Sequence, residues 1–78
     1  MTIENSKKLI ASFTKAAQAG DVGQAGAKLS KLEDYMLAAK VPAEVLDFVY
    51  DSAMTALTKG DTFDAVEHFT YGAFLIAR

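Results

Sequence analysis

The chain has no cysteine and no tryptophan, and it has a single proline and a single histidine among its 78 residues. Without cysteine, neither disulfides nor a thiolate metal site can stabilise the fold. One proline and few Gly/Ser runs argue against disorder. No apolar run approaches the roughly 20 residues of a membrane span, and the first residues lack the basic-then-apolar pattern of a secretory signal. We therefore expect an ordered cytoplasmic protein that does not bind a membrane.

Apolar residues are abundant, at 51% of the chain, and the formal charge is −2. The length predicts one domain, residues 1–78, and a domain this small has a marginal core. Charge is unevenly placed, because residues 1–40 hold six lysines and four acids whereas residues 41–78 hold two basic residues and six acids. So many apolar residues indicate either an efficient core or a surface that meets a partner.

Two Gly-Asp corners, Gly20-Asp21 and Gly60-Asp61, organise the chain. Glycine favours the left-handed conformation that ends a helix, and the aspartate that follows can accept hydrogen bonds from the first amides of the next helix. Pro42 marks a further helix start. We predict helices over residues 3–19, 22–39, 43–59 and 62–77. The predicted fold class is all-α, a four-helix bundle built from two antiparallel helical hairpins.

Each predicted helix carries an apolar face at three- and four-residue spacing. The residues expected to point inward are Leu9, Ile10, Phe13, Ala16, Ala17, Val22, Ala25, Leu29, Leu32, Met36, Leu46, Val49, Tyr50, Ala53, Ala56, Leu57, Ala65, Val66, Phe69, Ala73 and Ile76. Two glycines of the second helix, Gly23 and Gly26, either are simply tolerated or let a neighbouring backbone approach closely.

The two halves align at a shift of 40 residues, at which Gly20-Asp21 matches Gly60-Asp61. Stacked helix pairs are the architecture that such a period marks. The corner between two amphipathic helices resembles a tetratricopeptide-type hairpin, although that family repeats every 34 or so residues. The segments at 31–36, 41–45 and 56–65 are similar to the C-terminal helical domain shared by the COPII outer-coat subunit and the steroid receptor RNA activator protein. That resemblance implies a helical bundle that binds proteins without catalysis.

No catalytic motif is recognisable. Asp64 lies one turn before His68, which makes a metal half-site conceivable, but a transition metal needs three or four ligands. Glu44, Asp47 and Asp51 form a stripe that is more typical of a solvated face than of acid–base chemistry. We expect no catalytic residue, no metal and no cofactor.

Five lysines, namely Lys7, Lys8, Lys15, Lys28 and Lys31, could mark a basic strip across the first two helices. Nucleic-acid binding would require interleaved aromatic residues or a net positive charge. The chain is net negative, and no aromatic residue is recognisable among these lysines, so we expect no nucleic-acid partner.

The last predicted helix ends in a segment, residues 71–77, that is apolar nearly all round. Either another chain covers it, or it is a frayed hydrophobic tail. Phe48 falls off the inward face of the third helix. We predict a non-catalytic module that binds a larger protein through Phe48, Tyr71, Phe74 and Leu75, flanked by the acids Glu44, Asp47 and Asp51. Two alternatives are a small stand-alone inhibitor or adaptor, viral or bacterial, of a larger complex, and a structural homo-oligomer such as a homodimer.

Overall fold

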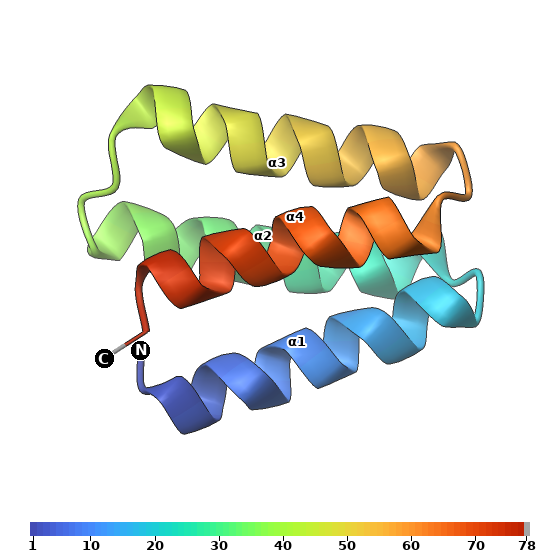
Figure 1. Ribbon diagram of the computed structural model, residues 1–78, viewed down its shortest axis with the longest axis horizontal. Helices are drawn as coiled ribbons and strands as arrows, with labels where there is room; N and C mark the ends of the chain where they lie inside the picture. Colours follow the sequence, from blue (N-terminus) through green and yellow to red (C-terminus); the bar gives the residue numbers. More distant parts are fainter. Residues whose placement is uncertain (78) are drawn as a thin grey trace.

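Four α-helices follow one another in the computed structural model, which describes residues 1–77 (Figure 1): α1 Ile3–Gln18, α2 Val22–Ala38, α3 Ala43–Thr58 and α4 Thr62–Leu75. No strand occurs in this part of the chain. The predicted all-α class and the four helix starts are confirmed. The observed helices end one or two residues before the predicted ends, because Ala19, Ala39 and Lys59 are C-caps and α4 stops at Leu75.

The first three helices all end with the same hydrogen-bond pattern. At the end of α1, the Gly20 amide donates to the Ala17 carbonyl and the Asp21 amide donates to the Ala16 carbonyl. This 5→2 and 6→1 pair defines the Schellman motif, which places one residue in the left-handed region. That residue is Gly20 (φ +73°) after α1 and Gly60 (φ +77°) after α3, as the sequence predicts, whereas Lys40 (φ +60°) occupies it after α2.

The helix starts confirm the expected caps. The Asp21 carboxylate accepts a hydrogen bond from the Gln24 amide at 3.0 Å, and the Asp61 carboxylate accepts one from the Asp64 amide at 3.1 Å. These contacts satisfy amides that have no partner inside the helix. With the cap directly after the left-handed residue, α1 reverses into α2, and α3 into α4, within three residues.

The two hairpins, α1–α2 and α3–α4, pack into a closed bundle (Figure 1). Each helix lies against its sequence neighbour, and α1 packs on α4, so that α2 and α4 meet only across the diagonal. The Ser6 hydroxyl, buried in α1, donates to the Thr2 carbonyl at 2.9 Å and lies 3.5 Å from the Ala73 carbonyl of α4. The start of the first helix is therefore adjacent to the end of the last one.

The core repeats at the 40-residue shift. Each buried residue of the first hairpin has a buried residue 40 positions later, and the pairs are Ser6/Leu46, Leu9/Val49, Phe13/Ala53, Ala17/Leu57, Ala25/Ala65, Leu29/Phe69, Leu32/Gly72 and Met36/Ile76. In several of these pairs, one half has a large side chain where the other half has a small one. Phe13 stacks on Phe69 with ring centroids 4.1 Å apart, whereas the positions equivalent to this pair hold Ala53 and Leu29. The two halves are thus equivalent in backbone pattern but not in side-chain volume.

One detail of the predicted faces is wrong. Val22 is 46% exposed, because it begins α2 at the end of the bundle, where neighbouring helices cover it only in part. Of the two alternatives for Gly23 and Gly26, the structure favours simple tolerance over a close backbone approach, since the nearest atoms to a Cβ there are side-chain atoms of Asp21 and Met54 at 3.6 and 3.9 Å.

The close approach is at Gly72 instead. A Cβ on Gly72 would lie 2.7 Å from Val49 Cγ1 and 3.3 Å from Leu32 Cδ2. Gly72 therefore lets α4 press against side chains of both α3 and α2.

None of the helices in residues 1–77 combines the length and apolar character that crossing a membrane requires.

Candidate functional site

Phe48 is the α3 residue of the predicted binding surface, and its side chain is 57% exposed. Its ring meets the His68 ring of α4 edge to face, with centroids 5.7 Å apart. His68 in turn lies 3.4 Å from the Asp64 carboxylate, one turn earlier on α4. The exposed aromatic of α3 is therefore in direct contact with α4.

Three further apolar residues of the prediction, Tyr71, Phe74 and Leu75, are exposed on α4, with Tyr71 at 52%. Tyr71 and Leu75 lie three and seven residues after His68, which puts them on the same side of α4. Because α3 and α4 are antiparallel neighbours (Figure 1), this side runs alongside Phe48. The predicted residues Phe48, Tyr71, Phe74 and Leu75 thus lie on one side of the bundle, and we call them the α3–α4 surface.

The three acids of the prediction are all exposed on α3. Glu44 and Asp51 lie one turn before and after Phe48, and helical spacing turns Asp47 toward α2. None of these carboxylates forms an ion pair with another residue of the described chain. They border the α3–α4 surface with uncompensated negative charge.

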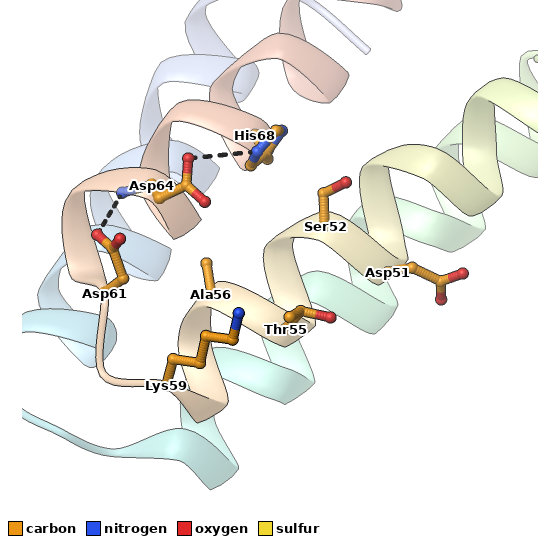
Figure 2. Close-up of a pocket in the computed structure, with 8 residues that line it drawn as sticks. All are labelled: Asp51, Ser52, Thr55, Ala56, Lys59, Asp61, Asp64 and His68. Carbon is orange, nitrogen blue, oxygen red and sulfur yellow. Dashed lines mark hydrogen bonds and ion pairs between the residues drawn. The ribbon is translucent and has the colours of Figure 1, made fainter.

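A polar hollow of about 370 Å³ lies between α3 and α4, next to the α3–α4 surface (Figure 2). Its lining residues are Asp51, Ser52, Thr55, Ala56, Lys59, Asp61, Asp64 and His68. In Figure 2 the Asp64 carboxylate points toward His68, while the Asp51 carboxylate points away from both. The Asp61 carboxylate is held by the Asp64 amide at the start of α4.

The hollow brings together the Asp64–His68 pair that was weighed as a metal half-site. Within residues 1–77 no group of three or more His, Cys, Asp or Glu side chains is arranged to hold a metal ion. The described residues thus place one carboxylate beside the imidazole, 3.4 Å away, and Phe48 lies against the same ring.

The lysines of the predicted basic strip are only partly brought together. Lys8, Lys28 and Lys31 line one groove between α1 and α2, whereas Lys7 and Lys15 are exposed outside it. Tyr35 also lines this groove, so an aromatic residue does lie among the lysines, contrary to the sequence argument. The groove faces away from α3, so the basic and acidic surfaces belong to different sides of the bundle.

Phe63 is a further exposed aromatic residue that the prediction missed. It is 77% exposed, more than any other large apolar residue of the described chain. Phe63 precedes Glu67 by four residues and Phe74 by eleven, so the spacing already used for buried faces would have placed it on the outer face of α4. The exposed apolar surface is therefore larger than predicted.

Comparison of this chain with protein-family models, with curated proteins and with solved structures gives no match. The resemblances to tetratricopeptide hairpins and to the vesicle-coat and RNA-activator domain stay predictions from the sequence.

Proposed function

We propose that this protein is a non-catalytic binding module that docks on a larger protein through the α3–α4 surface. The observation that carries the proposal is the gathering of Phe48, Tyr71, Phe74 and Leu75, all about half exposed, on two adjacent helices. Large apolar side chains that are contiguous and solvent-exposed are typical of interaction sites. The proposal includes a cytoplasmic location, which is a prediction from composition.

The size of the exposed surface supports a specific contact. The molecule has an accessible surface of 4626 Å², and a compact monomer of this mass is expected to have about 4,600 Å². The apolar exposure thus does not come from a loosely packed fold. The four side chains of the α3–α4 surface present on the order of 400 Å² of apolar area, which is within the range of the largest patch on ordinary monomers.

The bordering acids indicate the chemistry of the partner. Glu44, Asp47 and Asp51 would meet lysine or arginine side chains around an apolar pocket on the partner. Such exposed pairs contribute about 0–1 kcal/mol each to affinity, but complementary charge speeds and orients the encounter. We expect the apolar anchors to set the dissociation rate and the acids to set the salt dependence of association.

The test replaces Phe74 and Leu75 together by serine. Both side chains are exposed, so the helices should persist, as measured by circular dichroism, while binding is lost. The matched control is Leu37→Ser on α2, because Leu37 is also exposed but lies outside the α3–α4 surface. Affinity capture from native cell extract should recover the same partner with the wild type and with Leu37→Ser. Recovery of that partner by the Phe74/Leu75 double variant would contradict the proposal.

A stand-alone inhibitor or adaptor would use the same surface, and the identity of the captured partner separates it from a module of a larger assembly. The homo-oligomer alternative is favoured by a different observation, the arrangement of residues along α4.

A further inference from the structure

The outer face of α4 carries a row of four residues, Phe63, Glu67, Thr70 and Phe74, which we call the α4 row. The spacing along the row is four, three and four residues, so it is the same in both directions of the chain. Phe63, Glu67 and Phe74 are exposed and Thr70 is half-buried. The other exposed aromatic residues of the described chain are Phe48, Tyr71 and Tyr35, at 57%, 52% and 39%.

A row with symmetric spacing is complementary to itself when a second helix lies against it in the opposite direction. Phe63 then faces Phe74 of the second copy, and Glu67 faces Thr70 of the second copy. The two phenylalanines are eleven residues apart, or about 16 Å along the axis. An aromatic pair therefore lies at each end of the contact between the two rows, which we call the seam. In the middle, the Thr70 hydroxyl can donate a hydrogen bond to the Glu67 carboxylate of the other copy.

The two copies are related by a two-fold axis that passes between them at the middle of the contact. This axis places the flank of α4 that faces α3 in one copy next to the same flank in the other copy. Tyr71, which lies toward α3, therefore meets Tyr71 of the second copy at one edge of the seam. Phe48 lies further out on α3 and remains outside the contact. Such an interface is isologous, so it closes at two subunits and leaves no free half for further growth.

The surface area that two copies can bury in this contact limits its strength. One 14-residue helix face and its flanking side chains would give a total buried area on the order of 1,000 Å² for two copies, below the standard size of stable interfaces. The contact is thus large enough for a reversible dimer and too small for an obligate one.

We propose that a second copy of this chain binds to the α4 row in an antiparallel, two-fold arrangement, and that the free protein is in equilibrium between the monomer and this weak dimer. The inference rests on the proposed function in one respect. Tyr71 and Phe74 belong to both surfaces, so dimerisation and docking on the larger partner are mutually exclusive. The larger partner then binds only the monomer, so its binding shifts the equilibrium away from the dimer.

Sedimentation equilibrium over a concentration series tests the dimer. The wild type should show a monomer–dimer equilibrium with a Kd between about 1 μM and 1 mM. Phe63→Ser should weaken the dimer at least about tenfold, because it removes an aromatic contact at both ends of the seam. Phe48→Ser, a change of the same type at a similarly exposed aromatic, should leave the Kd within about twofold of the wild type.

Three results would overturn the proposal. The first is a wild type that stays monomeric up to about 1 mM. The second is an equal effect of Phe63→Ser and Phe48→Ser, or none from Phe63→Ser. The third is assembly beyond the dimer. Failure of the proposed function is seen separately, because Phe48→Ser should lose the larger partner while it keeps the dimer, and Phe63→Ser should do the reverse.

A cross-linking experiment tests the direction of the helices. The chain has no cysteine, so a single Glu67→Cys substitution introduces the only thiol. In the antiparallel register residue 67 lies within about 3 Å of the two-fold axis along the helix, so mild oxidation should give a covalent dimer. Lys15→Cys, which is exposed on α1, is the matched control and should stay monomeric. Equal yields of covalent dimer from the two variants would contradict the α4 seam.

Discussion

Lys40 occupies a backbone conformation that the other two corners give to glycine. Its φ of +60° falls in the left-handed region, as do those of Gly20 and Gly60. For a residue with a Cβ this conformation costs roughly 1–2 kcal/mol. The Val41 amide nevertheless donates to the Met36 carbonyl, so the same Schellman closure forms despite this cost.

Lys40→Gly should therefore stabilise the protein. We expect a gain of about 0.5–1 kcal/mol, because relief of the left-handed strain exceeds the added freedom of glycine in the unfolded chain. Urea unfolding monitored by circular dichroism measures it. Gly60→Ala is the reciprocal change and should cost about 1 kcal/mol, since a Cβ there meets no atom within 4 Å and only the backbone is strained. A loss of stability in Lys40→Gly would show that the lysine side chain contributes more than its backbone costs.

Gly72 is required by packing rather than by backbone angle. A Cβ at this position would lie 2.7 Å from Val49 Cγ1, and valine is stiff about its χ1 angle. Gly72→Ala should thus destabilise the fold by about 1–3 kcal/mol, although alanine is the better helix former. In a Val49→Ala background the same substitution should be neutral or stabilising. A double-mutant cycle in urea measures this coupling, and additive effects would exclude the predicted clash.

At the scale of helices, the aspartates that follow the left-handed glycines form equivalent caps. The Asp21 and Asp61 carboxylates each accept a hydrogen bond from the amide three residues on. We expect Asp21→Ala and Asp61→Ala to cost about 1 kcal/mol each and to be additive, because the two caps belong to different helices. Asp→Asn at either site should retain most of this stability. Thermal unfolding of the four single variants and the double alanine variant measures the effect.

The helices themselves were predictable because their signals are local. A Gly-Asp pair specifies both the end of one helix and the cap of the next, and both pairs act in this way in the structure. The exact ends were less accessible, because the amides of the C-caps Ala19, Ala39 and Lys59 still donate to the carbonyl four residues earlier, as in a helix. Only their ψ angles of −5°, 0° and −8° depart from helical values.

Contacts between helices were harder to infer. The spacing of Phe48 places it off the inward face, but it does not reveal that its ring meets His68 of α4. Likewise Gly23 and Gly26 were singled out because they lie inside a helix, whereas Gly72 makes the close contact. Such pairings depend on how one helix is rotated against the next, and a single-helix periodicity contains no information about that rotation. Phe63 differs for a simpler reason, since apolar spacing identifies buried faces and does not mark a single exposed aromatic residue on the opposite face.

At the scale of the whole molecule, surface properties differ between sides of the bundle. The side formed by α3 and α4 carries exposed aromatic residues and unpaired acids, and the groove between α1 and α2 carries Lys8, Lys28 and Lys31. The formal charge of −2 therefore describes neither side. Binding to the α3–α4 surface should weaken with added salt, while the net charge alone would predict little dependence.

The start of α1 lies beside the end of α4, as the Ser6–Ala73 contact shows, so the described residues, 1–77, begin and end at the same end of the bundle (Figure 1). Joining the ends with a short Gly/Ser linker and opening the chain between Lys40 and Val41 should therefore preserve the fold, with an unchanged helical spectrum. Opening the same joined chain between Phe13 and Thr14 should abolish cooperative unfolding, because that break lies inside α1 next to the stacked ring of Phe13. Similar thermal unfolding of the two permutants would contradict this.

The exchange of large and small side chains between the two halves limits which halves can associate. Two copies of residues 1–40 would bring two Phe13 rings to positions that accommodate one ring and one methyl group, and two copies of residues 41–78 would leave the Ala53 positions unfilled. Each half is thus sterically selective for the other. A chain that resembles a tandem duplication has in this way become a heteromeric pair within one polypeptide, in which neither half can replace its counterpart.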